Sequence, residues 1–500
     1  MSGTNQVRAL SRSAFALWLL LLSFGARGNA RFAIIDPVSA KASIHRDGDW
    51  IVENAPVFEC SDATLQQIYE FRWAVYHRHI VKTPDGYVVT EFLPKVLWAG
   101  KDNTISCAAG HHFYEGRWLT DPQYLNDYAL FWFRKGGDPR HYSFWAADAM
   151  WARYLANGDR DFAVGLLPDL IRNNQAWSKT HQDSNGVFWQ IDNSDGMEYS
   201  IGGSGYRPTI NSYMYGDDLA IAKIARLAGK RDVAEEYDQK AMALKKLIQQ
   251  KLWNPHANFF ETVPRGDGKT WAGVREEVGF IPWYFNLPDP SFDKAWSQLV
   301  DPQGFEAPYG PPTAERRSPR FDFAAKHDCL WNGPSWPYAT TQTLVALANL
   351  LNTDRQNFVS KADYLRLLRA YAHSQYKDGH PWIAEDLDAS SGKWIVDLPR
   401  SVEYNHSALC DLIITGFCGL RPRADETLEI NPLIPDGALD WFVVDGIPYH
   451  HHWITIVYDK TGQHFGRGAG LRVICDGTQA AASRAIERIT ARLAVGHPIP

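Results

Sequence analysis

"LANGDRD" at residues 155–161 is a phrase that returns twice, as "LAGKRD" at 227–232 and "LNTDRQ" at 351–356. Each copy ends one helical pattern with Gly or Asn, which often close helices, and leads into the next near an Asp, which often opens them. Two helices joined by so short a connection pack antiparallel to each other. The repeated phrase therefore predicts a chain of helical hairpins.

The clearest helical pattern runs from 233 to 252, with apolar residues at three- and four-residue spacing and Glu and Lys on the other side. Similar patterns cover 62–79, 121–134, 144–156, 160–178, 209–227, 334–351, 360–376 and 405–416. A tetratricopeptide-like solenoid would repeat every ~34 residues with little between the repeats. Here long loops rich in Trp, Gly and Pro separate the hairpins. We expect a mainly α-helical toroid whose loops converge on a central cavity, with "APYGPPTAERRSPR" at 307–320 as one such loop or as a linker.

The pattern changes from about Thr427 to short alternating runs such as "TLEINPLIP" and "GLRVICDG", which are typical of strands and turns. We expect a small C-terminal β-rich cap. The run His450-His-His452 is expected to lie within a strand, where successive side chains point to opposite faces. A metal site in that run is therefore not expected.

The first thirty residues resemble an export signal, with Arg8 and Arg12 ahead of an apolar run and small residues up to Ala30. We expect cleavage after Ala30 and a secreted or periplasmic protein with no stable membrane insertion, an uncleaved anchor being the alternative. The predicted organisation is a signal peptide (1–30), an N-terminal extension (31–59), a helical catalytic domain (60–422) and a C-terminal β-rich segment (423–500).

Composition excludes several classes of function. The 500 residues carry a net charge of −6, and cleavage would remove three arginines and no acid. Such a chain has no electrostatic reason to bind nucleic acid. The six cysteines form no CxxC pair, so no zinc ribbon or redox motif is predicted, and they are expected as buried thiols or disulfides. No cofactor and no metal are predicted, and the oligomeric state is left open.

Aromatic residues are abundant, with 20 Trp, 22 Tyr and 24 Phe. Flat rings pack in cores, but they also stack on the apolar faces of sugars while their OH and NH groups bind hydroxyls. Hydrolysis of a glycosidic bond with inversion needs an acid and a base roughly 6.5–9.5 Å apart. Two aromatic-rich loops offer acids: "WQIDNSDGMEYSIGGSG" at 189–205, with Asp195 and Glu198, and "WIAEDLDASSGKW" at 382–394, with Glu385.

Five motifs resemble those of the inverting (α/α)6-barrel glycosidases, the six-hairpin group that includes trehalase, the processing α-glucosidases of glycoside hydrolase family 63 and the mannosylglycerate hydrolases. They occur in the order expected for that group, across about residues 60–420. The motifs are "FYEGRW" (113–118), "SDGMEYS" (194–200), "LWNGPSW" (330–336), "WIAEDLDASSG" (382–392) and "YNHS" (404–407). The resemblance implies the (α/α)6 toroid and no cofactor, and it places "FYEGRW" on a loop that contacts substrate.

The resemblance also implies roles for individual residues. Glu385 matches the general base of the family, and Glu198 falls on its general acid. That acid is Asp in the family, and Asp195 stands where the family has Ser, so Asp195 is the alternative proton donor. The side chains expected to contact the sugar are Arg117, Trp118, Tyr142, Trp145, Trp189, Trp331, Asn332, Trp336, Trp382, Asn405 and His406.

The predicted function is therefore hydrolysis of an oligo- or polysaccharide by an inverting acid/base mechanism, with exo-action expected from a closed pocket. One alternative is a polysaccharide lyase or glycuronyl hydrolase on the same toroid, with Arg140, His141 and Tyr142 available to a lyase. The other is a glycan-binding protein without activity. The sequence does not identify the sugar or its linkage.

Overall fold

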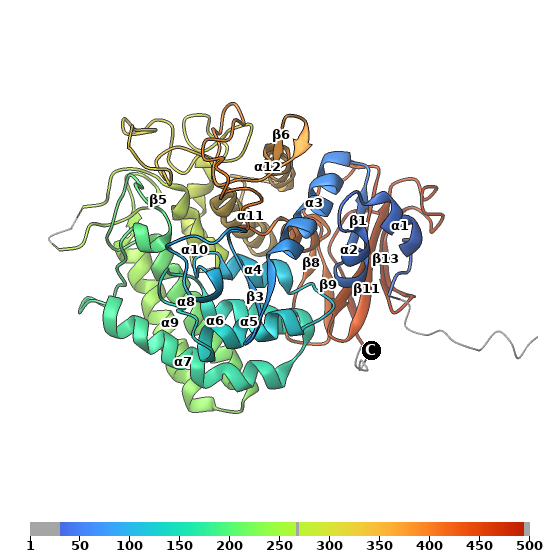
Figure 1. Cartoon of the computed structure of the whole chain (residues 1–500), viewed down its shortest axis with the longest axis horizontal. Coiled ribbons are helices and arrows are strands. Elements are labelled where there is room, and N and C mark those ends of the chain that lie inside the picture. The colour runs from blue at the N-terminus through green and yellow to red at the C-terminus, as the bar shows by residue number, and fades with distance from the viewer. Residues whose placement is uncertain (1–30, 267–269, 495–500) are drawn as a thin grey trace, which may run out of the picture.

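The computed structural model describes residues 31–266 and 270–494, so the predicted signal peptide lies outside the described residues. Helices dominate up to about residue 417 and strands dominate after it (Figure 1). The α-helices are α1 (Pro37–Ser43), α2 (Gly48–Asn54), α3 (Ala63–His79), α4 (Ala109–Gly116), α5 (Gln123–Arg134), α6 (Ala146–Asn157), α7 (Arg160–His181), α8 (Pro208–Leu227), α9 (Arg231–Lys251), α10 (Ile281–Tyr284), α11 (Pro337–Thr353), α12 (Lys361–Ser374) and α13 (Leu409–Leu412). The mainly helical fold with a C-terminal β-rich region is confirmed.

The repeated phrase lies at helix ends, as predicted. Its first copy joins α6 to α7: Gly158 closes α6 in the left-handed conformation, and the Asp159 side chain caps α7 by accepting from the Phe162 amide at 3.1 Å. The second copy joins α8 to α9, and the third follows α11. Side-chain capping places the boundary at the first copy, whereas Lys230 before α9 makes no side-chain cap bond and α11 ends at the extended Asp354.

One helix differs from the expectation. α4 covers most of the "FYEGRW" motif, for which the family resemblance implies a loop. The glycines of this helix serve close packing. A Cβ on Gly110 would lie 2.4 Å from the Trp145 ring, and one on Gly116 would lie 2.2 Å from the Tyr76 hydroxyl.

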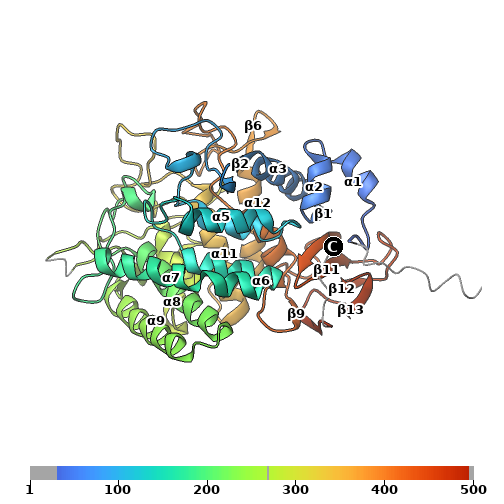
Figure 2. The same ribbon diagram turned by 60° about the horizontal axis from the view of Figure 1, so that its bottom comes forward.

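Burial separates inner from outer helices. Nearly every residue of α8 is buried, whereas α9 buries the one stripe that includes Tyr237, Leu244 and Ile248 and exposes charged residues opposite. α8 is therefore surrounded by protein, and α9 covers it from outside. In Figure 2, α7, α8 and α9 lie side by side at one end of the helical part.

A succession of contacts links the buried helices. α4 contacts α6, α6 contacts α8, α8 contacts α10 and α10 contacts α11. α11 in turn contacts α13, and α13 contacts α4. α13 continues as the π-helical turn η5 (Ile413–Phe417), which ends the helical part.

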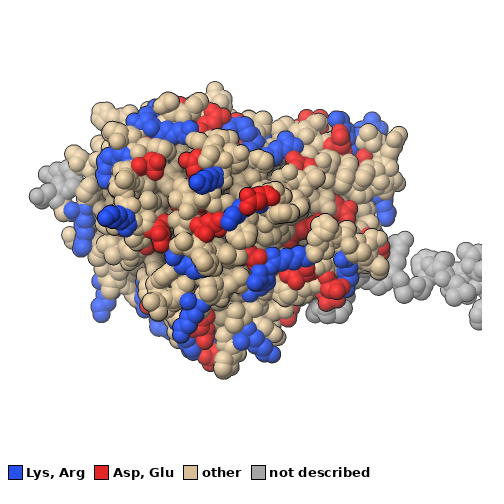
Figure 3. Space-filling view, turned by 45° about the horizontal axis from the view of Figure 1, so that its top comes forward, with Lys and Arg blue, Asp and Glu red and all other residues tan. Residues whose placement is uncertain are grey.

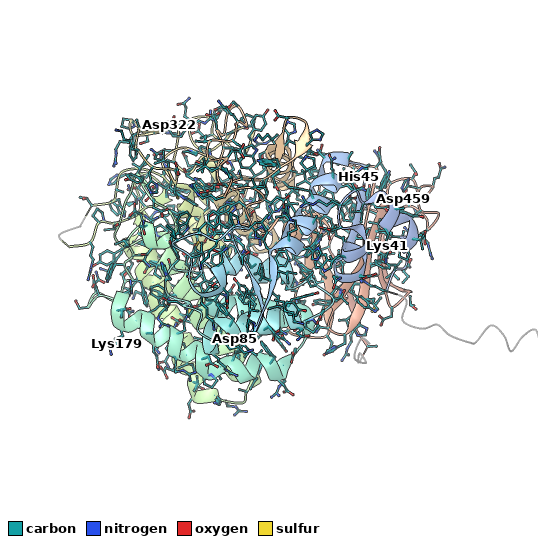
Figure 4. The ribbon with its side chains drawn as sticks, in the orientation of Figure 1. Lys41, His45, Asp85, Lys179, Asp322 and Asp459 are labelled. Atoms are coloured by element: carbon teal, nitrogen blue, oxygen red, sulfur yellow. The ribbon has the colours of Figure 1, made fainter. Side chains whose placement is uncertain are left out.

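The β-rich region contains a five-stranded antiparallel sheet in the order β1-β10-β11-β12-β13. Its strands are β1 (Val57–Cys60), β10 (Trp441–Tyr449), β11 (His452–Asp459), β12 (Gly470–Cys475) and β13 (Thr478–Ser483). A three-stranded sheet, β14-β9-β8, combines β8 (Leu420–Arg421), β9 (Thr427–Ile430) and β14 (Ile489–Arg492). The N-terminal strand β1 completes the edge of the larger sheet, and α1 and α2 lie beside it (Figures 1 and 2). Lys41 on α1 and Asp459 at the end of β11 accordingly appear on the same side of the molecule (Figure 4).

The expectation for the histidine run is wrong in part. His450 and His451 form the turn between β10 and β11, with φ of +48° and +66°, and only His452 lies in a strand. This two-residue hairpin turn is left-handed at both of its central residues, as in a type I′ turn, so it overrides the alternation expected of a continuous strand.

Long connections gather at one end of the helical part, at the top of Figure 1. Asp322 lies among them, and Lys179 near the end of α7 lies on the opposite side (Figure 4). Six further short strands form three antiparallel pairs in connections between helices: β2 (Ile80–Thr83) with β3 (Gly86–Val89), β4 (Trp253–Asn254) with β5 (Phe259–Phe260), and β6 (Tyr376–Lys377) with β7 (His380–Pro381). Figure 3 turns this end forward and shows Lys and Arg interspersed with Asp and Glu. This face offers no broad positive surface of the kind that nucleic acid requires.

Within the described residues, none of the helices has the length and apolar content to cross a bilayer. All six cysteines are free thiols, so the cysteines add no covalent link to the fold.

Candidate active site

A cavity of about 660 Å³ opens among these connections. Its volume is in the range of small-ligand sites. The residues that line it are Glu91, Phe92, Trp98, Ile105, Cys107, His141, Tyr142, Asn193, Gly196, Glu198, Lys326, His327, Asp328, Cys329, Trp331, Trp336, Tyr338, Glu385, Arg400, Tyr404 and His406. Three glutamates and several aromatic rings thus share one enclosure, although they are far apart in the sequence.

Glu198 lies on the loop between α7 and α8, which is held by local backbone bonds. The amide of Gly196, which is left-handed, donates to the Asn193 carbonyl at 2.9 Å. The amide of Trp331, on the loop before α11, donates to the Glu198 carbonyl at 3.0 Å. Tyr199 has φ of +59°, a conformation that costs energy in a non-glycine residue and persists only when its surroundings impose it. Backbone contacts within the loop and to the Trp331 loop therefore define its conformation, despite its polar composition.

Asp195 anchors this loop and does not line the cavity. Its side chain is fully buried and accepts from Arg207 Nε at 2.6 Å and from Thr209 Oγ1 at 2.5 Å. Ser143 donates a third bond to it. With both oxygens engaged away from the cavity, Asp195 has no route to a bound substrate.

Glu198 has weaker partners. Cys329 Sγ donates to its Oε2 at 2.7 Å, and Asn193 Nδ2 donates to its Oε1 at 3.3 Å. Burial raises the pKa of Glu198, against the opposing effect of the Cys329 bond. The carboxyl is thus disposed to hold a proton inside the cavity.

Glu385 lies on the connection between α12 and α13. Its carboxylate accepts from Ser401 Oγ at 2.5 Å and lies 3.5 Å from Arg400 Nε. Burial raises its pKa as well, while the Ser401 bond and the Arg400 charge oppose that rise. A paired backbone contact between Ser335 and Leu387, at 2.8 and 3.0 Å, fastens this connection to the loop before α11.

Glu91 is a third cavity glutamate, which sequence reasoning missed. It follows β3, is 3% exposed, and accepts from the Tyr404 hydroxyl at 2.5 Å. Burial above all, with the charges of Glu385 and Glu198, raises the pKa of Glu91 to about 8. It is therefore neutral near pH 7. No motif surrounds it; its only sequence signal is an acid directly after the buried run Val88-Val-Thr90.

Besides Arg400 Nε, which faces Glu385, two buried polar groups in the cavity wall lack a hydrogen-bond partner among the described residues. They are the Trp331 indole NH and the imidazole of His406, at both of its ring nitrogens. Burial lowers the pKa of His406 well below its ordinary value, so the ring is neutral. Unsatisfied buried polar groups are costly, and a ligand carrying hydroxyls would satisfy them.

Tyr142 and Trp336 also line the cavity. Trp336 stacks on Trp331 with ring centroids 4.9 Å apart, and its indole NH donates to the Leu330 carbonyl at 2.9 Å. His141 stacks on Tyr142 at 4.7 Å, whereas Arg140 donates to Asn173 and does not reach the cavity. The three residues considered for a lyase are therefore divided between two places.

Arg117 and Trp118 do not line the cavity. Arg117 Nε and Trp118 Nε1 both donate to Asp411 Oδ1, at 2.9 and 2.7 Å. Glu115 accepts from the amides of Cys410 and Asp411 in α13, at 3.0 and 2.8 Å. The polar residues of the "FYEGRW" motif thus fasten α4 to α13, which explains charged residues in a buried position.

Trp145 and Trp189 lie outside the cavity lining. Trp145 is fully buried against His111 and Tyr213. Trp189 stacks on His181 at 4.7 Å and carries the Arg265 guanidinium over its ring. Both rings are therefore engaged by neighbouring side chains of the protein.

Three further predicted residues also lie outside the cavity lining. Trp382 donates to Asp397 at 3.1 Å. Asn332 is fully buried, and its side chain donates to the Phe323 carbonyl at 2.7 Å. Asn405 donates to the Thr90 carbonyl at 3.2 Å. These polar groups hold the loops together around the cavity.

The matched family model spans residues 101–407, and it is described as the mannosylglycerate hydrolase MGH1-like glycoside hydrolase domain. The chain belongs to this family. The resemblance that the motifs indicated is thereby confirmed, and with it the prediction of a glycoside hydrolase domain.

Solved structures extend the comparison. A structure described as a sialidase shares 42% identity at a TM-score of 0.87, covering 95% of this chain and 44% of that one. The chain thus spans less than half the length of that protein. The GH63 mannosylglycerate hydrolase from Thermus thermophilus shares 14% identity at a TM-score of 0.54, and the match covers 70% of this chain and 100% of that one. The α-L-rhamnosidase from Aspergillus terreus shares 12% identity at a TM-score of 0.51, and the match covers 88% of this chain and 50% of that one. The last two are similar in fold alone.

Proposed function

We propose that the chain hydrolyses a glycosidic bond by single displacement with inversion, with Glu198 as the proton donor and Glu385 as the base that activates water. The observation that carries the proposal is the meeting of these two carboxyls in one cavity, in different environments. Carboxyls whose surroundings differ are the usual way to hold one proton donor and one base at the same pH.

Glu198 suits the acid because it is buried and bonded by a thiol and a long amide contact, which stabilise its charged form only weakly. Glu385 suits the base because a short hydroxyl bond and the nearby Arg400 guanidinium favour its carboxylate. Asp195, the alternative donor, is saturated by Arg207, Thr209 and Ser143. We therefore assign the acid to Glu198.

We further propose that α4, α6, α8, α10, α11 and α13 form the inner ring of an (α/α)6 toroid. The succession of contacts that begins and returns at α4 supports this arrangement, as does the burial of α8 inside α9. Loops at one end of such a ring would enclose the cavity. A closed pocket favours exo-action, which removes a sugar from a chain end or from a small glycoside.

The sugar held beside the acids is proposed to be neutral. Among the described residues that line the cavity, Lys326 and Arg400 are the only lysine and arginine. Lys326 is exposed, and Arg400 is engaged by Asp328 at 2.9 Å. The buried groups Glu91, His406 and Trp331 are neutral near pH 7 and suit hydroxyls, whereas neither of the two cations is buried as a preformed partner for a sugar carboxylate.

Two proposals concern the rest of the chain. The segment ahead of residue 31 is proposed to export the protein, because of its basic start and apolar run. The boundaries at 60 and 422 are proposed to delimit the catalytic domain, with β1 joining the C-terminal sheet across them.

The test uses Glu198→Gln and Glu385→Gln on paired neutral glycosides, one with an ordinary sugar leaving group and one with an activated aryl leaving group. An activated group departs without a proton. Glu198→Gln should therefore lose about 10²–10⁴-fold in kcat on the ordinary glycoside and much less on the activated one. Glu385→Gln should lose activity on both, because water is no longer activated.

Asp388→Asn is the matched control, since Asp388 is exposed on the same connection as Glu385 and outside the cavity. It should behave as the wild type on both glycosides. Equal losses on both glycosides for Glu198→Gln would contradict the assignment of the acid, and near-normal activity of Glu385→Gln would contradict that of the base.

A further inference from the structure

A cluster unrelated to the cavity lies at one end of the five-stranded sheet. Register pairs Ile454 of β11 with Cys475 of β12, so His452, two residues before Ile454, shares the face of Cys475. Asp476 opens the turn to β13 in the left-handed conformation, with φ of +49°. One ligand atom each of His452, Cys475 and Asp476 lies within 4.8 Å of the others.

The hydrogen bonds fix which nitrogen of His452 faces the cluster. Its Nε2 lies 3.0 Å from the Ala494 carbonyl oxygen, which can only accept, so Nε2 carries the hydrogen. In a neutral ring Nδ1 is then a bare lone pair. It lies 2.7 Å from Asp476 Oδ2, and Cys475 Sγ lies 3.9 Å from the same oxygen. The Cys475 thiol donates to this oxygen when it is protonated, and either a proton on Nδ1 or a metal ion between Nδ1 and Oδ2 removes the remaining repulsion.

We propose that His452, Cys475 and Asp476 bind a divalent ion of the zinc class. Imidazole nitrogen, thiolate sulfur and carboxylate oxygen are the ligands that Zn²⁺ takes in proteins. Histidine ligands commonly donate their second N–H to a backbone carbonyl, as His452 does to Ala494. The second oxygen of Asp476 accepts from the Trp453 amide at 2.9 Å, which holds the carboxylate in place.

Binding requires the three ligand atoms, which lie within 4.8 Å of one another, to adjust around the ion. Two ligands at about 2.0–2.1 Å from a tetrahedral ion lie about 3.3 Å apart, so Nδ1 and Oδ2 must separate slightly. Cys475 and Asp476 are partly exposed, which leaves a route for the ion and room for water as a fourth ligand. The Cys475 thiol releases its proton to the buffer as the S–metal bond forms.

The site has a structural consequence. The ion would join the start of β11 to the turn between β12 and β13 and, through His452, to the backbone at Ala494 beyond β14. None of the three residues lines the cavity. The ion is therefore expected to stabilise the C-terminal sheets without taking part in hydrolysis.

The test titrates Zn²⁺ into the chelator-treated full chain by calorimetry and Co²⁺ by absorption. We expect one equivalent of Zn²⁺, a higher midpoint of thermal unfolding, and a thiolate-to-cobalt charge-transfer band. Cys475→Ser should abolish the band, and Cys475→Ser and His452→Asn should each weaken Zn²⁺ binding by at least about 100-fold. His451→Asn, which alters an exposed neighbour in the turn, should change neither the cobalt band nor the affinity for Zn²⁺.

Folding of each variant is checked by circular dichroism and by hydrolysis of a glycoside or, failing that, by urea unfolding. If Cys475→Ser does not fold, the test relies on the cobalt band of the wild type and on the weakened Zn²⁺ binding of His452→Asn. A folded wild type that binds no Zn²⁺, or binds it only as well as both variants do, would overturn the proposal and leave His452 and Asp476 as an imidazolium–carboxylate pair.

Discussion

Glu91 is the residue whose role the structure changes most. A lone acid after a short strand gives no motif, yet the fold buries it in the same cavity as both proposed catalytic glutamates. Its pKa of about 8 implies that a neutral carboxyl contributes to the cavity at pH 7. Such a group can donate a hydrogen bond to a sugar hydroxyl, which a carboxylate cannot do.

Glu91→Gln should change how activity depends on pH. In the wild type, ionisation of Glu91 near pH 8 adds a charge to a cavity that already holds the Glu385 carboxylate. We expect kcat/KM of the wild type to show a loss above about pH 8, in addition to the loss caused by ionisation of the proposed acid Glu198, and we expect this added loss to vanish in Glu91→Gln. The measurement is the pH profile of both proteins on one neutral glycoside. An unchanged loss in the variant would show that another group causes it.

Stability gives an independent check on the same residue. Because the pKa of folded Glu91 is raised, the folded state keeps a proton that the unfolded state loses from about pH 4.5 upward. The free energy of unfolding of the wild type should therefore fall between about pH 4.5 and 8, relative to Glu91→Gln, by up to about 5 kcal/mol. Urea unfolding at several pH values measures this. A constant difference between the two proteins would contradict the burial argument.

The loop between α7 and α8 shows what motifs can and cannot assign at the scale of one element. The phrase "SDGMEYS" contains two acids three residues apart, and the choice between them depends on tertiary partners. Those partners are Arg207 and Thr209 on Asp195, and Cys329 on Glu198. Cys329 lies 131 residues from Glu198 along the chain, so no local pattern could supply that contact.

Asp195→Asn should therefore act on stability. Removing the charge leaves Arg207, which is fully buried, without its partner, and this should lower the free energy of unfolding by about 3–5 kcal/mol. The shape of the pH profile of kcat should be unchanged where the variant is folded. Glu198→Gln should show the reverse, with stability near that of the wild type and a large loss of kcat. Urea unfolding and kinetics on the same samples separate the two outcomes. A shift of the high-pH limb of kcat in Asp195→Asn would reopen its assignment as the proton donor.

Helix boundaries were predictable where cap chemistry is local, as at Asp159 before α7. α4 was not, because its motif and glycines suggest a loop, whereas Trp145 and Tyr76 require those glycines for close packing. Similarly, Arg117 belongs to a motif that points to a site, but its partner Asp411 is 294 residues away. Residues that fasten two helices and residues that contact substrate give the same one-dimensional signal.

At the scale of the whole molecule, the two ends of the described chain share one sheet. β1 pairs with β10, and the buried Asp445 carboxylate accepts from the amides of Ala33, Ile34 and Ile35 at 2.7–3.1 Å. Composition and periodicity predicted a C-terminal β-rich region. They did not predict the strand that the N-terminal segment adds, since a four-residue run is too short to show a period.

Asp445→Ala should weaken the whole molecule. It leaves three amides of the N-terminal segment and the Thr455 hydroxyl without their acceptor, and we expect a loss of about 3–5 kcal/mol in the free energy of unfolding. If the two parts unfold together, loss of activity and loss of secondary structure should occur at the same lowered temperature. Asp440→Ala, at an exposed position beside the same strand, should cost no more than about 0.5 kcal/mol. Activity that outlasts the sheet on heating would contradict a single cooperative unit.

The central claim is that Glu198 and Glu385 act together in a single displacement. The most direct test follows the anomeric proton of the released sugar by NMR in the first minutes of hydrolysis, before mutarotation, on a neutral glycoside that the wild type cleaves. We predict that the first product has the anomeric configuration opposite to that of the substrate, because water attacks the face away from the leaving group. Initial release of the sugar with retained configuration would contradict the mechanism.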